Sequence, residues 1–233
     1  MPVVPEPRIG GLSPLSTCDW PGQLVATIFC QGCPWSCRYC HNPHLIPADR
    51  AGDIPWRDVL AFLERRRGLL DGVVFSGGEP TLQVGLVDAI AVVRDLGFRV
   101  GLHTGGPYPD RLSGLLPRLD WVGFDMKAPF ADYARITGVP GSGERARASL
   151  GMLLDSGVDL EVRTTVHPAL LSTADLAGMA ESLGILGVRR FVIQCFRPQG
   201  CADDELATLP SALDGEAIGG IMARFPEGYI RVG

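Results

Sequence analysis

The sequence contains no long apolar run and no excess of basic residues. No stretch approaches the roughly 18 uncharged apolar residues of a membrane span, and residues 1–7 lack the apolar core of a signal peptide. Lys and Arg total 21 against 26 Asp and Glu, which gives a net charge of −5. An acidic chain of this kind is not typical of a general nucleic-acid binder. We expect a cytoplasmic protein that binds neither a membrane nor nucleic acid.

The chain also lacks an internal linker or low-complexity segment that would divide it. Its 233 residues are within the usual size of one hydrophobic core, so disulfide bonds are not needed for stability. We predict a single domain over residues 1–233, with a core over about 16–198 and a C-terminal extension over about 199–233.

The cysteines are unevenly distributed. Four of the seven fall within eleven residues, namely Cys30, Cys33, Cys37 and Cys40. An odd total excludes complete pairing, and neighbouring thiols in a reducing compartment are more often metal ligands or redox groups than structural disulfides. Cys18, Cys195 and Cys201 lie outside this cluster, and the sequence gives them no role.

Short β-branched apolar runs alternate with amphipathic segments along the chain. The runs predict six parallel strands, and the amphipathic segments predict helices that four glycines end: Gly68, Gly97, Gly157 and Gly184. Such repeats form either an open doubly wound sheet or a barrel. Polar residues follow the carboxyl end of each strand, which favours an α/β fold with a partial (β/α)6 TIM-type barrel. The predicted strands are 24–29, 72–75, 98–103, 121–125, 159–166 and 191–195, and the predicted helices are 56–67, 83–96, 111–116, 144–156, 173–183 and 214–224.

Three of the clustered cysteines have the spacing C-x3-C-x2-C, and Cys30 lies three residues upstream. A structural zinc site with four thiolates is one interpretation, and a redox dithiol is another. Zinc ribbons separate their cysteine pairs by a dozen or more residues, which is not the pattern here. Three thiolates on a four-iron cluster would leave one iron open, as a catalytic metal site requires.

This loop, with Tyr39 before its last cysteine, is followed after the next strand by Gly-Gly-Glu-Pro, and the combination resembles the radical S-adenosylmethionine (SAM) enzymes. The resemblance implies that Cys33, Cys37 and Cys40 hold a [4Fe–4S] cluster whose fourth iron binds SAM. It further implies contacts of SAM with a set of other residues. These are Tyr39 at the adenine, Gly77, Gly78 and Glu79 at the amino group, Lys127 at the carboxylate, and Arg163 at the ribose or carboxylate. Cys30 matches no ligand of the family, and we expect it to be buried at a strand end.

Further motifs resemble the activating enzymes of glycyl-radical proteins, most of all those that act on anaerobic ribonucleoside-triphosphate reductase. The implied function is reductive cleavage of SAM to methionine and a 5′-deoxyadenosyl radical, which takes a hydrogen from a glycine of the partner reductase. Flavodoxin or ferredoxin is the implied electron donor. The motifs are Ser-Thr-Cys-Asp-Trp-Pro-Gly at 16–22, His-Asn-Pro at 41–43, Phe-Asp-Met-Lys at 124–127 and Arg-Thr-Thr-Val-His at 163–167.

The sequence departs from these activating enzymes after the third strand. Where they commonly have Asp-Thr-Asn-Gly, the chain has His103 and Thr104 followed by two glycines. We expect His103 to be a neutral hydrogen-bonding group beside the cofactor. His167 either contacts the adenosyl group or is a satisfied polar residue at a strand end, and Asp125 with Lys127 is either part of the site or a structural ion pair.

Two other functions remain open on the sequence. One is a radical SAM enzyme that modifies a small molecule, a nucleobase or a peptide. The other is a zinc-stabilised binding protein that uses the same cysteines.

Overall fold

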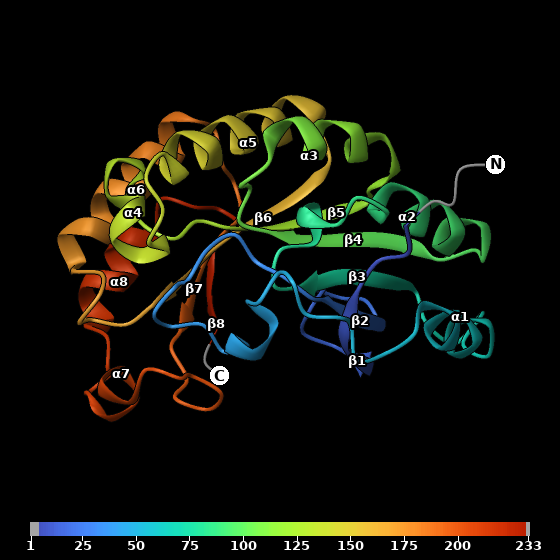
Figure 1. Cartoon of the computed structure of the whole chain (residues 1–233). Helices are drawn as coiled ribbons and strands as arrows, with labels where there is room; N and C mark the ends of the chain where they lie inside the picture. Colours follow the sequence, from blue (N-terminus) through green and yellow to red (C-terminus); the bar gives the residue numbers. More distant parts are fainter. Residues whose placement is uncertain (1–4, 232–233) are drawn as a thin grey trace. The chain divides into compact units, whose positions relative to one another are not determined.

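The computed structural model describes residues 5–231, in which eight strands form one mixed sheet in chain order, β1 to β8 (Figure 1). The strands are β1 (Ile9–Ser16), β2 (Val25–Cys30), β3 (Gly72–Gly77), β4 (Arg99–Thr104), β5 (Trp121–Asp125), β6 (Asp159–Val166), β7 (Phe191–Cys195) and β8 (Tyr229–Arg231). The α-helices are α1 (Trp56–Glu64), α2 (Leu86–Asp95), α3 (Pro109–Leu115), α4 (Tyr133–Thr137), α5 (Ser142–Ser156), α6 (Thr173–Ile185), α7 (Asp204–Thr208) and α8 (Gly215–Met222). No helix in the described part of the chain is both long enough and apolar enough to cross a membrane.

The described residues fall into two compact units. Unit 1 comprises residues 5–34, 44–104 and 108–123, and unit 2 comprises residues 35–43, 105–107 and 124–231. Strand β5 carries the chain from unit 1 into unit 2. The assignment of the whole chain to one domain stays a prediction.

Unit 1 is built on strands β1 to β4. Strand β1 pairs antiparallel with β2, and β2, β3 and β4 are parallel neighbours. Trp20 and Trp121 stack in its core with ring centroids 5.6 Å apart, beside Val25 and Val74. Because the parallel strands are in register, Cys30 lies opposite Gly77 and the carboxyl ends of β2 and β3 meet.

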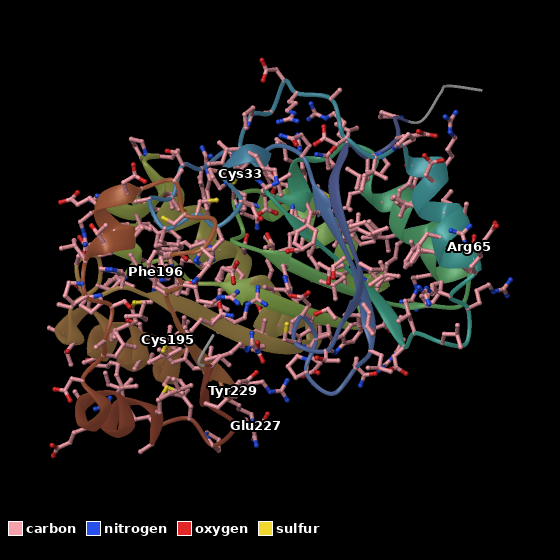
Figure 2. The ribbon with its side chains drawn as sticks, turned by 90° about the horizontal axis from the view of Figure 1, so that it is seen from below. Cys33, Arg65, Cys195, Phe196, Glu227 and Tyr229 are labelled. Atoms are coloured by element: carbon pink, nitrogen blue, oxygen red, sulfur yellow. The ribbon has the colours of Figure 1, made fainter. Side chains whose placement is uncertain are left out.

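Unit 2 contains the parallel strands β6, β7 and β8. Its longest helices are α5 and α6, and α6 begins with a capping box in which Ser172 and Asp175 satisfy each other's backbone N–H groups. Strand β8 is anchored by Glu161 of β6, which is fully buried and accepts from Tyr229 at 2.8 Å and from Arg231 at 2.9 Å. Tyr229 and Glu227 are labelled together at this strand in Figure 2.

The predicted strands correspond to β2 to β7, with ends that agree within two residues. Several predicted helix bounds are wrong by two or three residues. Helix α1 ends at Glu64 rather than at 67, α2 begins at Leu86 rather than at 83, and α6 continues through Gly184 to Ile185. The glycine with positive φ after α6 is Gly187, at 82°. Strand β1 and the short helices α4 and α7 have no counterpart in the sequence prediction. Arg65, which follows the last residue of α1, is exposed and lies at the margin of the view in Figure 2.

Candidate active site

In unit 1 the Gly-Gly-Glu turn at the end of β3 packs directly against the backbone after β2. A Cβ on Gly77, whose φ is 110°, would lie 2.4 Å from the backbone N of Cys30, and a Cβ on Gly78 would lie 2.3 Å from the backbone O of Gly32. The amides of Gly78 and Glu79 donate to the carbonyls of Cys30 and Gly32, each at 2.9 Å. The two glycines are therefore required because a side chain at either position would separate the turn from the segment that leads to Cys33.

The carboxylate of Glu79 is buried and held in place by hydroxyl groups. One oxygen, Oε1, accepts from the Thr81 amide at 3.0 Å, from the Thr81 hydroxyl at 2.6 Å and from the Thr104 hydroxyl at 2.8 Å. Glu79 is 3% exposed. A fixed carboxylate with a low-dielectric surrounding is complementary to an ammonium group. Thr81 was not predicted from the sequence, although its position two residues after Glu79 is the spacing of an Asx-type or capping contact.

His103 is tied to the scaffold of unit 1 through both ring nitrogens. Its Nε2 lies 2.8 Å from the carbonyl O of Asp19, and because a carbonyl only accepts, Nε2 carries the proton. Its Nδ1 lies 3.1 Å from the Ser76 hydroxyl, within hydrogen-bond distance. The ring also packs edge-on against Trp121, with centroids 5.5 Å apart. These partners join the ends of β3 and β4 to the segment before β2 through the His103 ring.

In unit 2 the cysteine loop, residues 35–43, carries Cys37 and Cys40. The loop makes one internal turn, in which the Cys40 amide donates to the Cys37 carbonyl at 3.0 Å, and the Ser36 amide donates to the Thr137 carbonyl at 3.0 Å. Burial raises the pKa of Cys37, and the nearby Lys127 ammonium opposes that rise. Burial also raises the pKa of Cys40, against the lowering effects of the Asn42 backbone and of Lys127.

Lys127 is the only lysine of the chain, beside 20 arginines, and it lies against the cysteine loop. Its Nζ is 5.6 Å from the centroid of the Tyr39 ring and 3.4 Å from Oδ2 of Asp125. Oδ1 of the same carboxylate is 2.8 Å from the guanidinium of the buried Arg163. Burial alone would lower the pKa of Lys127, yet Asp125 and the neighbouring Tyr39 and Cys37 raise it well above its usual value. Lys127 is therefore protonated at neutral pH.

Three buried polar atoms of unit 2 have no hydrogen-bond partner among the described residues: Nε2 of His167, the hydroxyl of Tyr39 and Nε1 of Trp35. Nδ1 of His167 accepts from the Ala169 amide at 3.1 Å, so Nε2 carries the proton and is a donor. A buried donor without an acceptor costs about 1–3 kcal/mol. Three of them in one unit indicate a ligand with acceptor atoms. Trp35 was not predicted as a site residue, because a bulky apolar residue between two cysteines indicates packing only.

The proposed cluster ligands are divided between the two units, with Cys33 in unit 1 and Cys37 and Cys40 in unit 2. Cys33 is labelled on the segment after β2 in Figure 2, and its amide donates to the Ile46 carbonyl at 3.0 Å. Within each unit no three His, Cys, Asp or Glu side chains of the described residues are grouped as metal ligands. All three cysteine side chains are partly accessible, and thiolates are the donor groups that iron–sulfur clusters use. Cys30 is fully buried, as expected.

In the iron-free protein, we expect iodoacetamide to react with Cys37 at least about tenfold more slowly than with the exposed Cys18, because a raised pKa removes thiolate. The rate at Cys37 should increase about tenfold per pH unit, because pH remains below that raised pKa. Lys127→Met should slow Cys37 further, since the ammonium lowers the pKa of this thiol. Peptide mass spectrometry measures the rates, and Arg145→Met, on the exposed side of α5, is the control. Equal Cys37 rates in wild type and Lys127→Met would contradict the electrostatic role of Lys127.

Known proteins provide the decisive comparison. The family model described as the Radical SAM superfamily matches residues 27–172. The chain belongs to the radical SAM superfamily. The enzymes of this superfamily use a [4Fe–4S] cluster and SAM, so the predicted cofactors are confirmed at the level of the family, and structural zinc is not supported.

Curated radical SAM relatives match most of the chain. A protein of Methanocaldococcus jannaschii, provisionally named a glycyl-radical enzyme activating enzyme, is 30% identical over 218 residues, which is 89% of this chain and 88% of the relative. A pyruvate formate-lyase-activating enzyme of Clostridium pasteurianum is 29% identical over 175 residues, 72% of each chain.

Solved structures confirm the radical SAM fold predicted from the sequence. SuiB of Streptococcus suis bound to SAM has a TM-score of 0.66 at 12% identity, over 87% of this chain and 48% of that chain. QueE of Escherichia coli has a TM-score of 0.58 at 17% identity, over 97% of this chain and 93% of that chain. At these identities the likeness establishes the fold and not the reaction.

Proposed function

We propose that this radical SAM enzyme activates a glycyl-radical enzyme, with anaerobic ribonucleoside-triphosphate reductase as the target. The observation that carries the proposal is the 30% identity to a protein named as such an activating enzyme, over nearly the whole length of both chains. The four motifs at 16–22, 41–43, 124–127 and 163–167 support the reductase as the partner. Relatives named for pyruvate formate-lyase make that enzyme the second target to test.

The residues of both units fit the two cofactors. Cys33, Cys37 and Cys40 would hold the [4Fe–4S] cluster, because three thiolates leave one iron open to SAM. When bound, the reduced cluster would supply the one electron that cleaves SAM into methionine and a 5′-deoxyadenosyl radical. Flavodoxin or ferredoxin would supply that electron. Transfer of a hydrogen atom from the Cα of a partner glycine to that radical would give 5′-deoxyadenosine and the glycyl radical.

The side chains of each unit would bind and orient SAM. In unit 1, Glu79 would accept from the methionine ammonium, beside Gly77, Gly78 and Thr104, while His103 keeps the ends of β3 and β4 in place. In unit 2, Lys127 would pair with the methionine carboxylate. Asp125 and Arg163 would hold Lys127 in place. Tyr39 would lie at the adenine, and the Nε2–H of His167 would donate to the adenosyl group.

Three features of unit 2 favour SAM as the ligand there. The unpartnered donors of His167, Tyr39 and Trp35 would gain the acceptor atoms that an adenosyl group offers. The protonated ammonium of Lys127 offers a positive charge with which the methionine carboxylate would pair. Burial of these groups would exclude water from the radical, as such chemistry requires.

The test is anaerobic reconstitution with iron and sulfide, reduction, and incubation with SAM and each candidate partner from the same organism. A glycyl-radical doublet in electron paramagnetic resonance should appear on the reductase, with about one 5′-deoxyadenosine formed per radical. A doublet on pyruvate formate-lyase alone would transfer the proposal to that target. Abundant 5′-deoxyadenosine without a radical on either protein would favour the enzyme acting on a small molecule, nucleobase or peptide.

A further inference from the structure

The cysteine loop of unit 2 is held from outside by a distant segment. Its one internal backbone hydrogen bond in the described structure joins Cys40 to Cys37, so the positions of these thiols depend on contacts beyond the loop. The two residues that bracket Cys40, Arg38 and His41, both contact residues 196–205. This segment, which follows β7, is here called the strap. Figure 2 labels its first residue, Phe196, beside Cys195 at the end of β7.

Arg38, between the two cysteines, is bound by the strap at three points. Its Nε lies 2.7 Å from Oδ2 of Asp203, and its Nη2 lies 2.8 Å from Oε2 of Glu205. Its backbone carbonyl accepts from the Cys201 thiol at 3.4 Å. The side chain and the backbone of one loop residue are thus fixed together.

His41, directly after Cys40, is bound by the other half of the strap. Its Nε2 lies 2.9 Å from the Arg197 carbonyl, and its ring lies 5.7 Å from the ring of Phe196. Gly200 approaches the His41 carbonyl so closely that a Cβ there would lie 2.5 Å from the oxygen. Any displacement of the strap would therefore be transmitted to both sides of Cys40.

The strap is itself anchored at both ends. Phe196 is buried, packs edge-on against His167 with centroids 5.0 Å apart, and donates its amide to the Val166 carbonyl at 3.1 Å. At the other end Asp203 caps α7 by accepting from the Leu206 amide at 3.0 Å, and Leu206 is buried. A segment fixed at two ends can impose a shape on the loop that it contacts.

We propose that the strap positions Cys37 and Cys40 for the cluster, with Arg38 and Asp203 as the main positioning residues. This inference rests on the proposed role of the two cysteines as cluster ligands. Arg38 is 45% exposed and Asp203 is 19% exposed, and ion pairs with that much exposure contribute little to global stability. Their purpose is then local: they restrict the loop so that the thiolates stay in place when iron is lost or gained.

The test compares Arg38→Gln, Asp203→Asn and the double variant with wild type. Asparagine at 203 retains the helix cap, so Asp203→Asn removes only the charge. Arg94→Gln breaks a pair of similar exposure, at 2.7 Å from Asp120 in unit 1, and is the control. Glu205→Gln should have a smaller effect, because Glu205 is 73% exposed.

Two readouts other than activity are measured. In iron-free protein, hydrogen exchange of residues 35–43 should become about tenfold faster in Arg38→Gln and Asp203→Asn. In reconstituted protein, release of iron to a chelator should become about tenfold faster, as for other residues that support metal ligands. The double variant should resemble Arg38→Gln, since that substitution already removes the pair with Asp203.

If residues 35–43 exchange in Arg38→Gln and Asp203→Asn at the same rates as in Arg94→Gln, the positioning role of the strap is overturned. Accelerated exchange with unchanged iron release would overturn it too, because the loop would then move without affecting its ligands. A wild-type protein that takes up no iron would overturn the proposed function. Hydrogen exchange is measured without iron, so faster exchange of residues 35–43 in Arg38→Gln and Asp203→Asn would even then show that the strap contacts restrict the loop.

Discussion

Cys37→Ala should remain folded but hold less than about one iron per chain, and should cleave SAM at least about a thousandfold more slowly than wild type. The reason is that removing one of three thiolates leaves two irons of the cluster without a protein ligand. Iron and acid-labile sulfide measure the cluster, and chromatography of 5′-deoxyadenosine measures the cleavage. Cys33→Ala and Cys40→Ala should behave in the same way.

Cys30→Ala is the matched control, because Cys30 lies three residues from Cys33 and yet has a different environment. It is fully buried at the end of β2, and burial, with the charge of Glu79, raises the pKa of its thiol. A protonated buried thiol is a packing group, so Cys30→Ala should lose about 1–2 kcal/mol of stability and keep its iron. Equal loss of iron in Cys30→Ala and Cys37→Ala would show that the ligand set is wrong.

Gly77→Ala should lose about 2–4 kcal/mol of unfolding free energy and bind SAM at least about tenfold more weakly. The new methyl group would lie 2.4 Å from the backbone N of Cys30, where no side chain can move away to make room. The turn would have to separate from the segment after β2, which would displace Gly78 and Glu79 with it. Urea unfolding of the iron-free protein and calorimetric binding of SAM to the reconstituted protein measure the two effects.

Gly97→Ala is the control that separates the steric clash at Gly77 from the cost of placing a side chain at positive φ. Gly97 follows α2 with a φ of 92°, and nothing lies within 4 Å of a Cβ built there. It should lose only about 1–2 kcal/mol, the cost of a side chain at positive φ, and should bind SAM normally. If both variants had the same unfolding midpoint and the same affinity, the close approach at Gly77 would have no function.

The parts of the fold that the sequence predicted are those whose signal is local. Strands β2 to β7 are apolar β-branched runs, and their periodicity is enough to place them. Strand β1 has the sequence Ile-Gly-Gly-Leu-Ser-Pro-Leu-Ser, which has low strand propensity, and it forms because β2 offers a partner along its free edge. Gly184 was taken as a helix end because glycine often ends helices, but α6 continues two residues to Ile185 and the glycine with positive φ is Gly187.

The candidate site shows the same division. Two short segments were enough to predict part of the site: the cysteine spacing at 33, 37 and 40, and the Gly-Gly-Glu turn at 77–79. The hydrogen bonds of His103 depend on Ser76, 27 residues away, and on Asp19, 84 residues away. The strap joins residues 38 and 203, which are 165 positions apart. Such partners are brought together by the tertiary fold, and no local sequence pattern predicts them.

The single lysine of the chain gives the site its own chemical handle. Because every other basic side chain except histidine is a guanidinium, reductive methylation with labelled formaldehyde can modify only Lys127 and the terminal amino group. Its methyl resonance would then report, without interference from any other lysine, on the space between Tyr39 and Asp125. Nuclear magnetic resonance could then follow the binding of a ligand beside this one residue in real time, without mutagenesis to assign the signal.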